Sequence, residues 1–266
     1  MSQSFNPVKF LLSKGNTNAK TAKNEIETYI LYLAPADTIA GFNLCPFASD
    51  GCKKSCLYIA GRGAFSNVQQ SRINKSRFWA YDRQAFYIQL TDEILTIAHR
   101  AQNKGTKVAI RLNGTSDIPH LELIQRYTGI NFLSSTYSHL LFYDYTKSPL
   151  QARKYAGTNY KVTFSRSESN ETTALQLLSE GVNVAAVFTE LPEYWNGYKV
   201  INGDLTDLRY FDPAGVVVGL IAKGPAKKDK SGFVINTEAM RTEQERERVS
   251  IMNYIDAQES AMFERY

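Results

Sequence analysis

Short apolar runs alternate along the chain with longer stretches in which apolar residues recur every three or four positions. The short runs are rich in β-branched and aromatic residues and end at Gly or polar residues, which is typical of strands. They predict six strands, at 29–33, 107–112, 139–143, 160–164, 182–188 and 216–221, and a short additional one at 198–201. Because these runs are continuously apolar, they favour a parallel sheet that is covered on both faces.

Helices are predicted between the strands. Residues 67–103 contain neither Gly nor Pro, and apolar residues such as Phe86 and Ile94 follow helical spacing, which predicts one long helix or two consecutive ones. Shorter helical segments are predicted at 119–127, 149–155 and 170–180.

The C-terminal stretch has a helical pattern of its own. It is charged, lacks Gly and Pro, and carries apolar residues at near-helical spacing: Val249, Met252, Ile255, Met262 and Phe263. The pattern predicts an amphipathic helix whose apolar side docks on the rest of the protein. A contact between two copies in a dimer is the alternative.

The alternation of strands and helices predicts an α/β protein. We expect a partial (βα)6-type, TIM-like barrel, with an open doubly wound sheet as the alternative, because polar residues directly follow the strands. Residues 1–266 are expected to form a single domain, since no repeat or linker divides them. Its parts are an N-terminal segment with the first strand and a cysteine-bearing loop (1–66), the βα repeats (67–236) and the C-terminal helix (237–266).

The loops that follow parallel strands open onto one face, where ligands bind. We therefore expect a small-molecule site formed by Asn113, Thr115, Ser116, Asp117, Ser165, Arg166 and Glu168. Arg166 can clamp a carboxylate or a phosphate through two hydrogen bonds. The alternative is local structure, in which Asp117 and Ser169 or Asn170 cap the helices that follow them.

Composition and charge indicate which class of molecule the protein binds. With 43% hydrophobic and 21% charged residues, the chain is neither disordered nor fibrous. Residues 1–80 hold ten Lys or Arg and four Asp or Glu, a local net charge of +6, so the other 186 residues carry −1 of the total of +5. This excess suits DNA, RNA or another anion, and a merely solvated surface is the alternative. Basic and aromatic residues also alternate at Arg72, Lys75, Arg77, Phe78, Trp79, Tyr81 and Arg83, although aromatic residues on a helix more often belong to the core.

The three cysteines, Cys45, Cys52 and Cys56, fall within twelve residues in the loop after the first strand. An odd, clustered number argues against a disulfide scaffold and for a reducing compartment. The chain opens MSQSFNPVKF, without a charged and then apolar leader, and its apolar runs are far shorter than the about 20 residues of a membrane span. We therefore expect a cytoplasmic protein with no membrane partner.

The C-x6-C-x3-C spacing predicts a metal centre, because thiolates from one short loop converge on a soft metal. Cys52 and Cys56 are expected to share a helical face, with Gly51 turning the chain back toward Cys45. Lys53 and Lys54 are expected to lower the thiol pKa values. A 4Fe-4S cluster on three cysteines leaves one iron open to a substrate, a cofactor or another ligand.

Two other interpretations of the cysteines remain. A zinc ion needs a fourth ligand, for which His120 is the best candidate ahead of His99, His139 or an aspartate. Simple burial of three free thiols is the last alternative, although the loop is polar and Gly-rich. Three cysteines after the first strand of a partial barrel is also the layout of radical S-adenosylmethionine enzymes. Their usual C-x3-C-x2-C spacing is absent, so membership would be of a divergent kind.

The chain resembles a known family in Lys14-Gly15-Asn16, in TYILYLAPADT, in CPFASDGCKKSCLYIAGRG and in RLNGTSD. These segments are similar to the bacteriophage "gene product 88" proteins over most of the chain, most specifically at the cysteine block and at residues 111–117. The resemblance implies a viral protein made in the host cytoplasm that carries an iron-sulfur cluster on Cys45, Cys52 and Cys56. It implies no particular reaction.

Two functions follow from these patterns. The first is a metalloenzyme with an open iron, which binds S-adenosylmethionine or a substrate. The second is a nucleic-acid-binding phage protein whose iron-sulfur or zinc site is structural and positions the basic N-terminal third. The motifs of P-loop nucleotide-binding proteins, zinc proteases, serine hydrolases and dinucleotide-binding proteins do not occur in the sequence.

Overall fold

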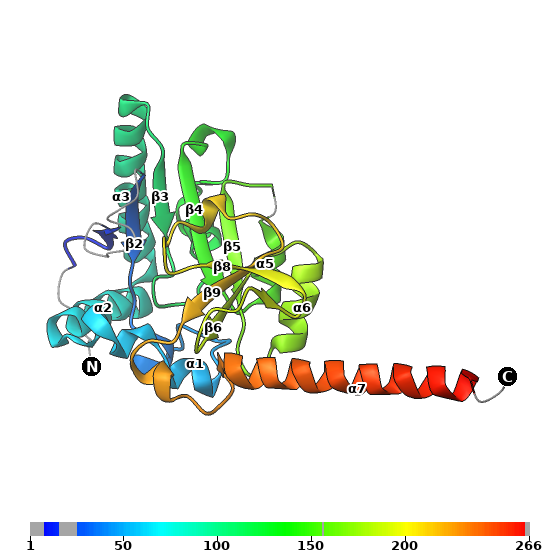
Figure 1. The fold of residues 1–266 in the computed structure, drawn as a ribbon. Coiled ribbons are helices and arrows are strands. Elements are labelled where there is room, and N and C mark those ends of the chain that lie inside the picture. The colour runs from blue at the N-terminus through cyan, green and yellow to red at the C-terminus, as the bar shows by residue number, and fades with distance from the viewer. Residues whose placement is uncertain (1–7, 16–25, 156, 264–266) are drawn as a thin grey trace.

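The computed structural model describes residues 8–15, 26–155 and 157–263 and is a mixed α/β structure (Figure 1). The strands are β1 (Leu12–Lys14), β2 (Glu27–Leu31), β3 (Val108–Arg111), β4 (Leu140–Thr146), β5 (Tyr160–Ser165), β6 (Val184–Phe188), β7 (Tyr194–Trp195), β8 (Tyr198–Asn202), β9 (Val217–Ile221) and β10 (Val234–Ile235). The helices are α1 (Asp50–Lys54), α2 (Ser66–Tyr81), α3 (Arg83–Lys104), α4 (His120–Thr128), α5 (Pro149–Lys154), α6 (Glu171–Ser179) and α7 (Thr237–Phe263).

The described strands form one ten-stranded sheet in the order β1-β2-β3-β4-β5-β6-β9-β8-β7, with β10 beside β6. Strands β2, β3, β4, β5, β6 and β9 run parallel in chain order, and they are the six predicted strands. The predicted short strand at 198–201 is β8, whereas β1, β7 and β10 were not predicted. The pairings do not close the sheet into a ring.

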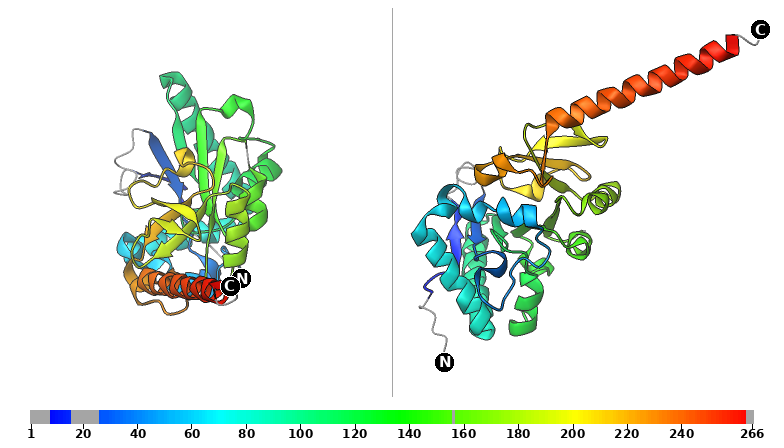
Figure 2. Two further views of the ribbon diagram at one scale, coloured as in Figure 1. Left: turned by 45° about the vertical axis from the view of Figure 1, so that its right-hand side comes forward. Right: turned by 90° about the horizontal axis from the view of Figure 1, so that it is seen from below.

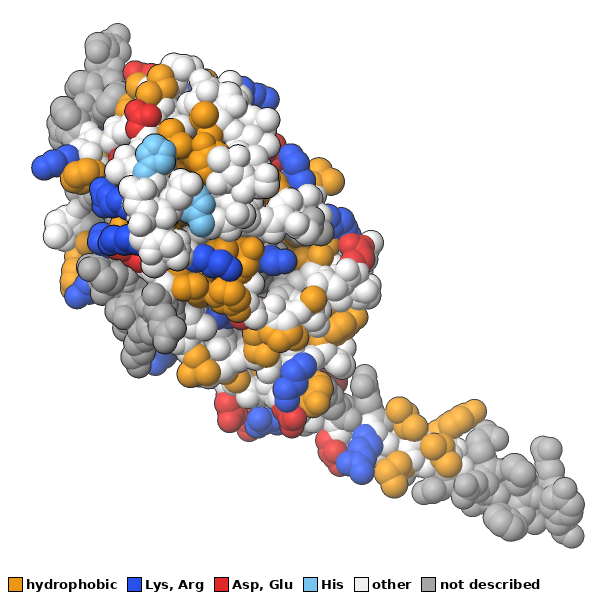
Figure 3. All heavy atoms as spheres, turned by 90° about the horizontal axis from the view of Figure 1, so that it is seen from above, with side chains coloured by type: hydrophobic (Ala, Val, Ile, Leu, Met, Phe, Trp, Pro, Cys, Tyr) orange, Lys and Arg blue, Asp and Glu red, His pale blue; other side chains and the backbone are white. Residues whose placement is uncertain are grey.

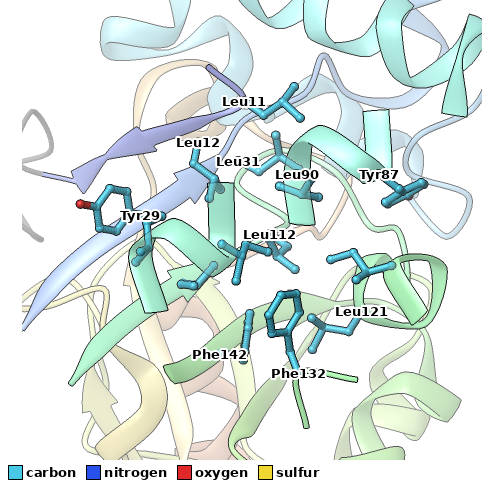
Figure 4. Close-up of a cluster of buried hydrophobic side chains, with 14 of the residues drawn as sticks. Leu11, Leu12, Tyr29, Leu31, Tyr87, Leu90, Leu112, Leu121, Phe132 and Phe142 are labelled. Carbon is cyan, nitrogen blue, oxygen red and sulfur yellow. The ribbon is translucent and has the colours of Figure 1, made fainter. Parts of the chain in front are cut away.

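The main core lies between one face of the sheet and the helices. Figure 4 shows Leu31 and Phe142 from the sheet packed with Leu90 of α3 and Leu121 of α4. A second cluster joins α6 to β6 and β9. The helices cover this face of the sheet because their apolar residues recur every three or four positions and so form one buried side.

The opposite face of the sheet is covered by an irregular segment. Ala109 and Tyr143 point away from the helices and pack with Leu208. The segment around Leu208 includes a 3-10 helix, Arg209–Phe211, which contacts β4 and β5. The prediction that both faces are covered is therefore confirmed, but the α-helices of the main core supply only one of the two covers.

The predicted helical region 67–103 forms two helices. α2 ends at Tyr81 and α3 begins at Arg83, and the carboxylate of Asp82 between them accepts a hydrogen bond from the backbone N of Ala85 at 3.0 Å. Such a side-chain cap starts a new helix and explains the break, because no Gly or Pro is present.

The predicted C-terminal helix is confirmed as α7, but its docking is wrong. α7 projects away from the rest of the protein (Figures 1 and 2), and apolar side chains along it lie in the open (Figure 3). Val249, Met252 and Ile255 are 48%, 54% and 48% exposed. The stripe therefore has no partner among the described residues. Helices of the described part of the chain are too short or too polar to cross a membrane.

Candidate metal centre

The cysteine loop, residues 32–66, leaves the carboxyl end of β2 and crosses the end of the sheet at which the parallel strands finish. The right-hand view of Figure 2 looks onto this end, with α1 and the start of α2 lying across it. The loop is tied to the residues after β3: Thr115 Oγ1 donates to the carbonyl of Leu33 at 2.5 Å, and the backbone N of Asp117 donates to that of Leu44 at 2.8 Å. The predicted position of the loop is confirmed.

Each cysteine has a different local setting. The Sγ of Cys45 lies 3.7 Å from the carbonyl oxygen of Thr115. Cys52 lies within α1, which Ser49 caps by accepting a hydrogen bond from the Cys52 backbone N. Cys56 lies beyond the end of α1, and its Sγ accepts a hydrogen bond from the backbone N of Tyr58 at 3.5 Å. The prediction that Cys52 and Cys56 share a helical face is therefore wrong, because α1 ends between them.

The three thiols are close enough to influence one another electrostatically. The pKa of Cys45 is raised to about 12, mainly by burial and in smaller part by the neighbouring Cys56, Asp117 and Cys52. Burial also raises the pKa of Cys56, and Cys52 adds to the increase. The structure thus places the three predicted ligands in one loop as free, half-buried thiols.

The cations near this cluster are not the predicted ones. Arg72 and Lys147 are the positive groups that oppose the rise in the pKa of Cys56. Lys53 instead forms an ion pair with Asp37 at 3.2 Å, and Lys54 is exposed. The expected lowering of the thiol pKa values by Lys53 and Lys54 is therefore wrong for Cys45 and Cys56, where burial dominates.

Glu168, predicted as a ligand residue after β5, holds the cysteine loop. Its carboxylate accepts hydrogen bonds from Ser49 Oγ and from the backbone N of Gly51, both at 2.8 Å. Gly51 packs so closely that an added Cβ would lie 2.7 Å from Cβ of Phe233 and 2.8 Å from Oε2 of Glu168. Gly51 therefore provides space for this contact and does not turn the chain, since it lies inside α1.

The predicted ligand residues after β3 bond mainly to the protein itself. Asn113 Oδ1 accepts from Ser116 Oγ and from the backbone N of Ile118, both at 2.9 Å. The Asp117 carboxylate accepts from Thr146 Oγ1 at 2.7 Å and from the backbone N of Lys147 at 2.8 Å. Asp117 thus joins two strand-end loops and does not cap α4, which begins after Pro119 without a side-chain cap.

Arg166 binds the segment whose Phe233 packs against Gly51 of the cysteine loop. It is 8% exposed, pairs through Nε with Glu171 at 3.1 Å, and donates from Nη1 to the carbonyl of Phe233 at 3.1 Å. Its neighbour Ser165 accepts a hydrogen bond at its carbonyl from Asn170. These bonds fix the segment before β10 to the end of β5.

Arg72 lies beside the cysteine loop, which the sequence did not predict. Its guanidinium carbon lies 4.7 Å from the ring centroid of Tyr32 and 5.7 Å from that of Tyr58. Its position on α2 relative to Ser76 and Trp79, at i, i+4 and i+7, places it on the buried side of the helix. That spacing is the signal that distinguishes Arg72 from the exposed Arg77.

Three free thiols are a donor set for a 4Fe-4S cluster or, with a fourth ligand, for a zinc ion. Among the described residues, no three His, Cys, Asp or Glu side chains are arranged to hold a metal ion. The buried Nη1 of Arg72, beside Cys56, also lacks a hydrogen-bond acceptor, which a sulfur of such a cluster would supply.

The best zinc candidate lies in the hydrophobic core. His120 is 1% exposed, its Nδ1 is 3.2 Å from the hydroxyl of Tyr87, and its ring stacks on Phe86. Burial lowers the pKa of His120 to about 3, so the ring is neutral. His99 is exposed on α3. His120 is therefore a core histidine, as the packing of Phe86 and Tyr87 around it requires.

The chain matches the model of a known protein family. The model of a family described as "Gene product 88" matches residues 10–237. No curated protein matches the chain, and no solved structure does.

Proposed function

We propose, from the premise that this chain belongs to the Gene product 88 family of phage proteins, that it is an iron-sulfur protein. Cys45, Cys52 and Cys56 would hold a 4Fe-4S cluster. The observation that carries the proposal is the half-buried group of three free thiols, which interact electrostatically at the carboxyl end of a parallel sheet. This is where α/β proteins bind their ligands.

Different residues of the chain would have different roles in such a site. The cysteines bind as thiolates, and binding has to overcome the raised pKa values of Cys45 and Cys56 by displacing their protons. Glu168 and Asp117 keep the loop in place through the bonds described above. When bound, a cluster with three cysteine ligands supplies one-electron transfer and an iron open to a further ligand.

We further propose a divergent, radical-S-adenosylmethionine-like enzyme that binds this molecule or a substrate at the open iron, in the cytoplasm of the host cell. The strand order supports the partial (βα)6-type barrel on which this proposal rests. Six parallel strands follow one another in chain order, without the reversal that defines a doubly wound sheet, and the helices cover one face.

Metal analysis tests the proposal. The protein, purified and reconstituted without oxygen, is expected to hold about four irons and as many sulfides per chain and to give an electron paramagnetic resonance signal when reduced. Replacing Cys45, Cys52 and Cys56 by Ala should abolish iron binding, whereas Lys54→Ala, an exposed change in the same loop, should not. Stoichiometric zinc in a colourless protein would contradict the cluster. A reduced spectrum that S-adenosylmethionine leaves unchanged would contradict only the enzyme.

A second function, binding of DNA or RNA, is favoured by the surface of the same loop. Phe47 and Phe65 are 54% and 59% exposed, and the exposed cations Lys53, Lys54 and Arg62 lie between them in the sequence. Exposed rings stack on bases while cations contact phosphates. The predicted stretch at 72–83 supports this function less, because Phe78, Trp79 and Lys75 are buried.

Single-strand binding measured by fluorescence anisotropy tests this second function. Affinity should fall steeply with salt, because each neutralised phosphate releases counterions. Phe65→Ala should weaken binding by about 1–3 kcal/mol, whereas Phe211→Ala, which removes a ring of similar exposure on another loop, should not. Absent or salt-independent binding at low ionic strength would contradict nucleic-acid recognition.

A further inference from the structure

Arg72 is a largely desolvated cation without an anionic partner. No carboxylate among the described residues pairs with it, and two tyrosine rings flank its guanidinium. Its Nη1 is fully buried and has no hydrogen-bond acceptor. Burial is the main reason why the pKa of Arg72 is lowered.

Such an arrangement requires an explanation. Native structures satisfy nearly all of their buried polar atoms, and a guanidinium that loses water without gaining a counter-ion destabilises the fold. Tyr32 and Tyr58 offer the cation only the faces or edges of neutral rings. Tyr58, whose ring centroid lies 5.7 Å from the guanidinium carbon, donates a hydrogen bond from its backbone N to Sγ of Cys56, so Arg72 lies on the Cys56 side of the loop.

The backbone around Arg72 is tied to the chain after β2, so the side chain starts from a fixed point beside the cysteine loop. The carbonyl of Arg72 accepts a hydrogen bond from Ser76 Oγ at 2.9 Å, and the same Oγ accepts one from the backbone N of Ala34 at 2.7 Å. α2 is thereby joined to the chain just after β2. Arg72 belongs to α2, which begins at Ser66 where the cysteine loop ends, so the position of α2 determines where its side chain starts.

We propose that Arg72 is the counter-ion of the sulfur-bound centre: its Nη1 donates a hydrogen bond to a sulfur on the Cys56 side and raises the reduction potential of the cluster. This inference rests on the proposed iron-sulfur function. It assigns to Arg72 a positioning and electrostatic role, not a role as a ligand.

The sign of the effect follows from charge. One-electron reduction adds a negative charge to the centre, and a nearby cation stabilises the reduced form more than the oxidised form. Hydrogen bonds to the sulfurs act in the same direction, and both are established determinants of cluster potentials. Removing the charge of Arg72 should therefore shift the potential to a more negative value. Lys147, whose Nζ lies 6.0 Å from the ring centroid of Phe233, is a second positive group that acts on Cys56, so part of the stabilisation should remain.

A redox titration followed by electron paramagnetic resonance measures the effect. The reconstituted wild-type protein is compared with Arg72→Gln, which removes the charge, and Arg72→Lys, which keeps it. Arg77→Gln is the matched control, because Arg77 is exposed on the same helix. We expect a more negative midpoint for Arg72→Gln, a smaller shift for Arg72→Lys and none for Arg77→Gln.

The outcomes separate this inference from the function on which it rests. A wild-type protein that binds no iron overturns both. A loaded Arg72→Gln protein with the wild-type midpoint overturns only the role of Arg72. If Arg72→Gln does not load, Arg72→Lys decides: normal loading with a near-wild-type midpoint supports the counter-ion, and failure to load in a folded protein, judged by circular dichroism, overturns it in favour of a purely structural role.

Discussion

Single side chains at the cysteine loop substitute for regular secondary structure. The loop contains one five-residue α-helix, α1, and three 3-10 helices of three or four residues. One carboxylate from another loop, Glu168, accepts bonds from Ser49, which caps α1, and from Gly51 within it. A carboxylate at the first turn also interacts favourably with the exposed N–H groups there. Glu168 should therefore matter to the loop more than its partly exposed position suggests.

Glu168→Ala leaves the buried backbone N of Gly51 without its acceptor. We expect the free energy of unfolding to fall by about 1–3 kcal/mol. Glu193→Ala is the control, because Glu193 is 72% exposed and pairs only with the exposed Lys199 among the described residues. Urea denaturation should show a shift for the first variant and less than about 0.5 kcal/mol for the second. Equal midpoints for both variants would show that Glu168 does not hold the loop.

The same contact makes stability depend on pH. Burial alone would raise the pKa of Glu168, but the hydrogen bonds from Gly51 and Ser49 outweigh it and lower the pKa below its usual 4.5. The charged form is thus favoured by folding, so the stabilisation is complete above pH 4.5 and is lost as pH falls through the lowered pKa. Thermal unfolding of the wild type and of Glu168→Gln should converge in this acidic range. A difference that is constant down to pH 3 would contradict this linkage.

At the scale of elements, the apolar runs predicted all six long parallel strands, because a buried parallel strand requires a continuous run. β7 and β10, with two residues each, are too short to leave a pattern. The break at Asp82 was left open, since a cap depends on local hydrogen bonding that spacing does not encode. The prediction that α7 docks on the protein was wrong. An apolar stripe indicates that a helix is amphipathic, but it does not indicate what covers the apolar side.

α7 contributes to the fold mainly through its first turn. Thr237 is fully buried and donates to the carbonyl of Glu190, and Met240 packs on the cluster around α6. Deleting residues 243–266 should therefore change the free energy of unfolding by less than about 0.5 kcal/mol, whereas Met240→Ala should cost roughly 1 kcal/mol. Differential scanning calorimetry measures both. A large loss on deletion would mean that the rest of α7 docks on the protein in solution.

Across the whole molecule, the candidate site combines parts that are distant in the sequence. Spacing alone located the thiols, because Cys45, Cys52 and Cys56 belong to one loop. The residues that hold the loop, such as Asp117 and Glu168, come from the ends of other strands. They were predicted to bind a ligand, because a polar residue that binds a ligand and one that holds a loop have the same pattern in a sequence. Arg72 was missed because its place depends on how α2 packs against the loop.

The projecting α7 also affects how the protein moves in solution. Its 27 residues span about 40 Å, more than twice the radius of gyration of about 18 Å that a compact chain of 266 residues would have. An arm of this length resists rotation about any axis across it. The protein should therefore tumble anisotropically, with slow end-over-end rotation, so that a spectroscopic label near its C-terminal end and one in the sheet would report different correlation times.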